Sequence, residues 1–255
     1  MKLFWRATSA SLVLFLPLYA SGYIPSANFL IKMMLAANQA VQNVRVEQIA
    51  TTFNEDSGSE DLQVSEVLYL RIPDSYRLDI ESRDGKKTII YKRGELLTTE
   101  AGRVTSESPD EMSISKDLFI RRSVDDVIQL LRSRKVDTER MGLGRFDGKI
   151  AFIIGATERE TESPQLWIEK ENFLPLRFIV RAEKKVAVAN VEIRYLDYKQ
   201  VDGKYWYPFT IEFYHDNTLA VRYQAQRVVI NTNVPDNLFD IVKIRKESVK
   251  TTHGR

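Results

Sequence analysis

Residues 207–213 read Tyr-Pro-Phe-Thr-Ile-Glu-Phe, and a large apolar side chain occupies every second position of this stretch. Residues 174–181, Leu-Pro-Leu-Arg-Phe-Ile-Val-Arg, repeat the alternation, with Ile179 as the exception. Successive side chains of a β-strand point to opposite faces of its sheet. This period of two therefore predicts an antiparallel sheet with one apolar face and one mostly polar face.

Turn signals recur at intervals of roughly 8 to 15 residues from Val46 onward, which is typical of strands joined by hairpins. They are Asp84-Gly85, Arg93-Gly94, Asp147-Gly148, Asp202-Gly203 and His215-Asp216-Asn217. The chain has no internal repeat and no Pro/Gly/Ser-rich linker. The sequence therefore predicts that residues 23–242 form a single domain.

Helical signals are few. Over residues 26–44 apolar side chains recur at i, i+3, i+4 spacing behind Ser26, a suitable cap. This helix either covers an apolar groove or packs on its own core. Ser108–Glu111 and Ser123 each resemble the start of a further short helix. Residues 243–255 are charged and lack periodicity, which predicts a mobile tail.

Composition excludes several classes of protein. The 255 residues are 44% hydrophobic and 28% charged, which excludes a disordered chain. The net charge of +2 gives no indication of nucleic acid binding, and the absence of cysteine excludes disulfides, thiolate metal sites and a lipidated cysteine. With two histidines and no assembled nucleophile, base and orienter, we predict no catalytic residue, no metal and no cofactor.

Residues 1–22 have the three parts of a secretory signal: a basic head with Lys2 and Arg6, a short apolar body, and small residues ending at Gly22. An uncleaved anchor is the alternative. Cleavage removes two of the 37 basic side chains and leaves 35 against 35 acidic ones. We therefore expect an exported protein that is neutral overall, and we predict that it is a monomer.

The apolar sheet face is the predicted working surface. A large sheet must cover such a face with a second sheet, with helices or with a ligand, and the predicted helices are short. The sequence thus predicts an apolar concavity for acyl chains, with filling by the protein's own side chains as the alternative. Strand alternation and the first helix nominate Met33, Met34, Leu68, Leu70, Phe152, Ile154, Phe178, Val180, Tyr195, Phe209, Ile211, Phe213, Val221 and Tyr223 as ligand-binding residues.

Four stretches, in this order along residues 26–242, carry a resemblance to a known family. They are Val-Arg-Val-Glu-Gln at 44–48, Leu-Tyr-Leu-Arg-Ile-Pro-Asp-Ser-Tyr-Arg-Leu at 68–78, Gln-Leu-Trp-Ile-Glu-Lys-Glu-Asn-Phe-Leu-Pro-Leu-Arg at 165–177, and Val-Pro-Asp-Asn-Leu-Phe-Asp-Ile at 234–241. Together with the signal peptide, they resemble the LolA-type lipoprotein carriers and the wider outer-membrane lipoprotein-sorting group.

The resemblance implies an α+β fold, mainly antiparallel: an incomplete, curved β-barrel covered by a few helices that act as a lid over an apolar cavity. In the carriers an arginine directly before the hairpin proline bonds lid carbonyls. Here Ile72 precedes Pro73, and Arg71 lies one residue earlier. Arg71 is the candidate lid contact, although a shift of one residue on a strand reverses the side-chain direction.

Three functional hypotheses follow. The first is a non-catalytic periplasmic carrier or binder of lipoproteins or other lipids that works with an inner-membrane transporter or regulator. The second is an envelope sensor of the same fold, and the third is a carboxylate-based hydrolase, because two acids brought together by a fold suffice for hydrolysis.

Overall fold

A computed structural model describes residues 24–54, 57–83, 85–107, 114–160, 162–183 and 188–253. The predicted signal peptide and the helix start predicted at residues 108–111 lie outside these ranges. Among the described residues, none of the helices has both the length and the apolar character that crossing a membrane requires.

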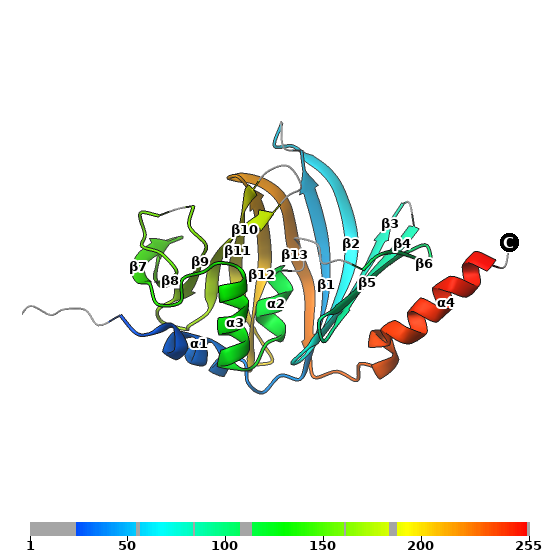
Figure 1. Cartoon of the computed structure of the whole chain (residues 1–255), viewed down its shortest axis with the longest axis horizontal. Helices are drawn as coiled ribbons and strands as arrows, with labels where there is room; N and C mark the ends of the chain where they lie inside the picture. The colour runs from blue at the N-terminus through cyan, green and yellow to red at the C-terminus, as the bar shows by residue number, and fades with distance from the viewer. Residues whose placement is uncertain are drawn as a thin grey trace, which may run out of the picture.

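A curved antiparallel sheet of 13 strands forms the body of the protein (Figure 1). The strands are β1 (Asn43–Phe53), β2 (Glu60–Arg71), β3 (Ser75–Ser82), β4 (Gly85–Lys92), β5 (Glu95–Glu100), β6 (Arg103–Ser106), β7 (Met141–Phe146), β8 (Lys149–Ile154), β9 (Gln165–Glu169), β10 (Pro175–Glu183), β11 (Val188–Val201), β12 (Tyr205–His215) and β13 (Thr218–Ile230). Their spatial order is β6-β5-β4-β3-β2-β1-β13-β12-β11-β10-β9-β8-β7. The predicted mainly antiparallel, incomplete barrel is confirmed, with β6 and β7 as its open edges.

The chain builds this sheet outward from the centre and then back. Strands β1 to β6 follow one another by short turns, and β7 to β13 return the same way until β13 pairs with β1. Asp147 and Asp202 have positive φ and each precedes a glycine of positive φ. Asp147-Gly148 forms the two-residue turn between β7 and β8, and Asp202-Gly203 begins the three-residue turn between β11 and β12. The predicted turns at Asp147-Gly148 and Asp202-Gly203 are therefore confirmed.

Helices α2 (Ile114–Ile120) and α3 (Val124–Ser133) lie against the concave side of the sheet, and α1 (Ala27–Ala36) lies beside α3 at one end of it (Figure 1). Ser26 and Ser123 cap α1 and α3 by accepting the backbone N–H of Phe29 and Asp126. Helices α2 and α3 lie in the connection between the two edge strands, which carries the chain across the concave side. The helix predicted for residues 26–44 is too long, because Val44 is a β1 residue paired with both neighbouring strands.

The C-terminal segment contains two helices. The short 3₁₀ helix η2 (Asp236–Phe239) is followed by helix α4 (Ile241–His253), which covers most of the tail predicted for residues 243–255 and lies on the outer side of the sheet near β6 (Figure 1). Ile241 packs with Ile90 and Leu97, apolar residues on the outer faces of β4 and β5. This contact could not be predicted from the sequence, because three apolar residues on two strands and a helix give no periodic signal.

Charged residues tie the outer faces of β10 to β12 together. Glu192 accepts hydrogen bonds from Arg177 at 2.6 Å and from Arg194, and the Arg194 guanidinium lies 3.8 Å from the ring centroid of Tyr214. Burial opposes ionisation of Glu192, but the two arginines outweigh it and hold the pKa of this carboxyl below its usual value. The polar face predicted from the alternation is thus a network across three strands.

Candidate functional site

The concave face of the sheet is apolar and buried. The nominated residues in its core are Met34, Leu68, Leu70, Phe152, Ile154, Phe178, Val180, Tyr195, Ile211, Phe213, Val221 and Tyr223, with Phe209 partly buried against them. Met33 is half-buried outside this core, because neighbouring positions of a helix point about 100° apart and Met34 faces the sheet. The structure therefore gathers the nominated strand residues on one face.

The helices fill the concavity, which differs from the open cavity predicted from the sequence. Leu30 of α1, Leu118 of α2 and Leu131 of α3 are buried in the same core as the strand residues. Short helices suffice because each inserts large side chains into the curve of the sheet. Two small cavities lie under this cover, with volumes of about 30 Å³ and about 10 Å³. Since one water molecule needs roughly 10–15 Å³ by this measure, neither holds an acyl chain as it stands.

Phe119 of α2 separates the two cavities, because its side chain lines both. Its ring meets Tyr195 of β11 edge-on, with centroids 5.5 Å apart, and lies 5.7 Å from the ring of Tyr207 of β12. Such aromatic contacts each contribute about 0.5–1.5 kcal/mol beyond the burial of their area. A displacement of α2 that withdraws Phe119 would join the two cavities along the sheet.

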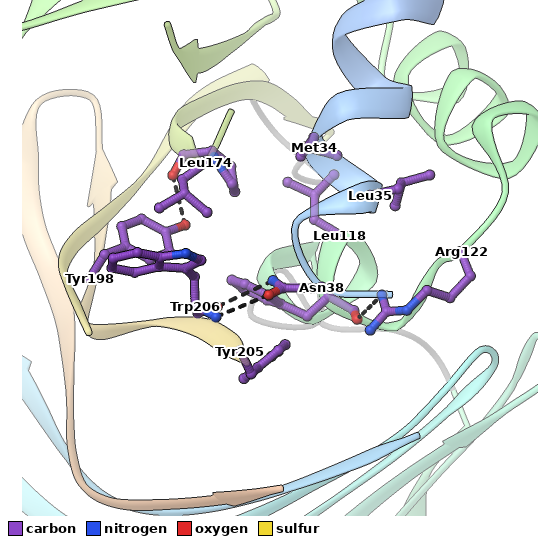
Figure 2. A pocket seen from close by; sticks show the side chains of 11 residues that line it. Met34, Leu35, Asn38, Leu118, Arg122, Leu174, Tyr198, Tyr205 and Trp206 are labelled. Carbon is purple, nitrogen blue, oxygen red and sulfur yellow. Dashed lines mark hydrogen bonds between the residues drawn. The ribbon is translucent and has the colours of Figure 1, made fainter. Parts of the chain in front are cut away.

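The first cavity lies where α1, the end of α2 and the start of β12 meet. Its lining comprises Met34, Leu35, Asn38, Leu118, Phe119, Arg122, Leu174, Pro175, Tyr198, Tyr205 and Trp206 (Figure 2). Asn38 fixes the end of α1, since its amide donates to the Trp206 carbonyl at 3.2 Å and accepts the Trp206 N–H at 3.0 Å. The Tyr198 hydroxyl donates to the Pro175 carbonyl at 2.8 Å. This wall is mostly apolar and rigidly held.

The second cavity lies on the other side of Phe119 and is lined by Gln48, Leu68, Leu70, Ser115, Lys116, Phe119, Tyr207, Ile211 and Tyr223. Gln48 of β1 donates to the Glu66 carboxylate of β2 at 2.7 Å. The Lys116 ammonium lies 5.8 Å from the ring centroids of Tyr76 and Tyr223. Of the nominated residues, Leu68, Leu70, Ile211 and Tyr223 line this cavity, and Met34 lines the first.

Asp117 of α2 is a buried acid between α2 and α3. Its carboxylate lies 3.8 Å from the Arg134 guanidinium, and Arg121 and Lys116 also attract it. Burial raises the pKa of Asp117 despite these cations. Burial likewise raises the pKa of Tyr195, so its hydroxyl stays neutral at physiological pH. Among the described residues, no group of three or more metal-ligating side chains is found.

Arg71 does not contact the lid. Its guanidinium lies on the outer face, where it donates to the Val234 carbonyl at 3.1 Å, pairs with Asp236 at 2.7 Å and stacks on Phe239 at 4.3 Å from the ring centroid. The predicted lid contact is therefore wrong. The reason is the strand period: Leu70 faces the core, so Arg71 faces outward and holds the segment that leads to α4.

Sequence reasoning missed the residues of α2. Phe119, Leu118 and Arg122 come from a segment whose seven helical residues, Ile114–Ile120, are all buried. A helix buried all round has no amphipathic stripe, so the helical period gives no signal. The apolar run Leu118-Phe119-Ile120 is the one feature of the sequence that indicates burial here.

The comparisons place this geometry among known folds. The chain is similar to an outer membrane lipoprotein-sorting protein domain from Vibrio parahaemolyticus, with a TM-score of 0.57, 12% identity and coverage of 86% of this chain and 97% of that chain. The protein has the LolA-like fold. The LolA superfamily protein NE2245 from Nitrosomonas europaea matches with a TM-score of 0.55, 12% identity and coverage of 85% and 98%.

A third match is a DUF1329 family protein from Desulfovibrio piger ATCC 29098, with a TM-score of 0.51, 14% identity and coverage of 86% and 97%. No protein-family model matches the sequence, and no curated protein matches it at the level of sequence. The resemblance found in the sequence is thus confirmed for the fold. At 12–14% identity these matches show the fold alone, so the activity needs its own argument.

Proposed function

We propose that this LolA-like protein is a non-catalytic carrier or binder of acyl chains, taken from a lipoprotein or another lipid in the periplasm. The observation that carries the proposal is the cover of the concave face. Phe119 of α2 lies between two cavities, and both cavities adjoin the apolar concave face. Helix α2 has seven residues and no hydrogen-bonded place in the sheet, so it can leave the face while the sheet stays intact.

The energetics favour a chain as the ligand. Each methylene removed from water contributes about 0.8 kcal/mol, so a long acyl chain supplies several kcal/mol after ordering costs. Binding costs the free energy with which α2 packs on the sheet, because the acyl chain must displace this helix. An acyl chain that covers the same apolar side chains as α2 restores most of the lost burial, which makes the exchange feasible.

Solvent extraction tests the proposal. The protein is purified from a bacterial envelope fraction, its lipids are extracted and identified, and displacement of the apolar dye N-phenyl-1-naphthylamine by decanoate is measured. We expect bound lipid and dye displacement. Finding neither would refute acyl-chain binding. A stable membrane-protein partner in cross-linked envelopes, with no lipid bound, would instead support the sensor hypothesis.

A charge on the concave face provides a variant test. Phe209 is partly buried, and the Lys199 ammonium lies 4.4 Å from its ring centroid. Phe209→Asp therefore places a carboxylate at the apolar face next to a cation that helps the variant to fold. We expect uptake of decanoate to be lost from the folded variant. Unchanged uptake would contradict the placement of the chain on this face.

A further inference from the structure

Arg122 stands out among the side chains that line the first cavity. It lies in the junction between α2 and α3, where its Nη1 donates to the carbonyls of Phe119 at 3.0 Å and Arg121 at 2.8 Å. Its Nε and Nη2 are buried and have no hydrogen-bond partner among the described residues. Half of the guanidinium is thus fixed by the end of α2, and the other half is unused.

No carboxylate among the described residues balances the charge of Arg122. Burial lowers the pKa of Arg122, and the neighbouring group that opposes this shift is the Tyr205 hydroxyl rather than a carboxylate. The Tyr205 hydroxyl is also buried without a hydrogen-bond partner in the described part of the chain. Guanidinium and hydroxyl donors that remain unpaired in a folded protein call for a partner, because burial removes them from water.

Two other cations near the concave side have partners. Lys116 of the second cavity lies over the rings of Tyr76 and Tyr223 and is thereby provided with partners. Arg134 lies 3.8 Å from the Asp117 carboxylate. Among the described residues, Arg122 is the cation that lines one of these two cavities and has donors without an acceptor, and apolar Met34, Leu118 and Leu174 line the same cavity. Donors for an anion therefore adjoin a surface for a hydrocarbon (Figure 2).

We infer that Arg122, assisted by Tyr205, binds the phosphate or carboxylate of an acidic amphiphile, whose chain runs along the sheet from the first cavity to the second once Phe119 is withdrawn. This inference rests on the proposed function and adds the class of ligand. A guanidinium presents N–H groups in a fork that matches both oxygens of such an anion. The ligand is then an acidic lipid, and its orientation on the sheet is fixed by its charged end.

Competition binding tests this assignment. Decyl phosphate, decanoate, 1-decanol and inorganic phosphate are each titrated against dye bound to the full-length protein. We expect decyl phosphate and decanoate to bind at least tenfold more tightly than 1-decanol, because a charged hydrogen bond to a buried guanidinium adds to the affinity of the chain. Inorganic phosphate should neither displace the dye nor weaken decyl phosphate at millimolar concentration. Equal competition by inorganic phosphate would show a site for the free ion and overturn the assignment to a lipid.

Two variants of Arg122 and one control test whether the preference for acidic chains depends on this side chain or on positive charge in general. Arg122→Gln should bind decyl phosphate as weakly as 1-decanol and leave 1-decanol unchanged, while Arg122→Lys should keep part of the preference. Arg132→Gln, the matched control, removes the same charge from α3, where the side chain is 62% exposed, and should keep the full preference. Near-ultraviolet circular dichroism verifies that each variant is folded.

The outcomes distinguish the two proposals. If 1-decanol and the acidic chains bind equally, or if Arg122→Gln keeps the preference, the anion site is wrong while acyl-chain binding stands. If none of the ten-carbon probes displaces the dye, the proposed function fails and the anion site with it.

Discussion

Replacing Phe119 by alanine is the most informative change to the cover of the concave face. Phe119 is 8% exposed and contacts Tyr195 and Tyr207 through its ring. Truncating a buried phenylalanine to alanine costs about 3–5 kcal/mol. These contacts exist only while α2 lies on the sheet. The substitution therefore destabilises the covered state and does not affect a state in which an acyl chain has replaced α2.

The expected result has two parts. The free energy of unfolding of Phe119→Ala falls by about 3 kcal/mol, measured by urea denaturation. Because each 1.4 kcal/mol is a factor of ten in an equilibrium constant, the same loss raises the affinity for decanoate by up to about 100-fold. Dye displacement at equal protein concentration measures this affinity.

Ile153→Ala is the matched control for Phe119→Ala. Ile153 is completely buried in a separate cluster with Trp167 and Leu176. Its truncation should cost about 2–5 kcal/mol of stability and leave decanoate affinity unchanged. If Phe119→Ala folds and binds decanoate no more tightly than the parent, or if Ile153→Ala gains affinity as well, α2 is not the cover that the ligand displaces.

Three further predictions concern the rest of the fold. Arg71→Gln should increase hydrogen exchange of the amides of residues 234–248 and leave decanoate binding unchanged, because Arg71 holds this segment to the outer face; unaltered exchange would contradict that assignment. Glu192→Gln should lower stability by about 3 kcal/mol at pH 7, because Arg177 and Arg194 lose their acceptor. The pKa of Glu192 is depressed in the folded protein, so its contribution to stability is present above the unfolded pKa of about 4.3 and is lost as pH falls further. In urea denaturation between pH 3 and pH 7, the free energy of unfolding should therefore fall less steeply with acid in the variant than in the parent. Parallel curves would disprove the network's role. Gly155→Ala should prevent stable folding, because its added Cβ would lie 2.5 Å from the Pro164 carbonyl oxygen at a φ of +106°, and a soluble variant with the parent's melting temperature would refute this.

Much of the sheet was predictable from the sequence, because strand alternation is a local property. The apolar positions of 207–213 occupy the concave face as expected, and the chain turns at Asp147-Gly148 and at Asp202-Gly203. The alternation failed at Leu176, which lies in the outer cluster although Phe178 lies in the main core, because the pairing of β10 with β9 is irregular between Pro175 and Arg177. One irregularity of this kind reverses a face and leaves no mark in the sequence.

The contents of the concavity were not predictable in the same way. Whether α2 fills the curve or leaves it open depends on contacts such as Phe119 with Tyr195, which are far apart in the sequence. Likewise, Arg122 follows Arg121 in a stretch that reads as an ordinary charged loop. Only the fold shows that Arg122 and Tyr205 line one cavity.

Photo-crosslinking is the most direct test of the central claim that an acyl chain occupies the concave face in place of α2. Decanoate with a diazirine at its far end is bound, irradiated, and mapped by mass spectrometry of peptides. The account predicts labels on the inward residues of β11 to β13, such as Tyr195, Tyr207 and Ile211, and their loss on competition with unlabelled decanoate. Labels confined to the outer face around Arg177 and Tyr214, or none that decanoate competes away, would contradict it.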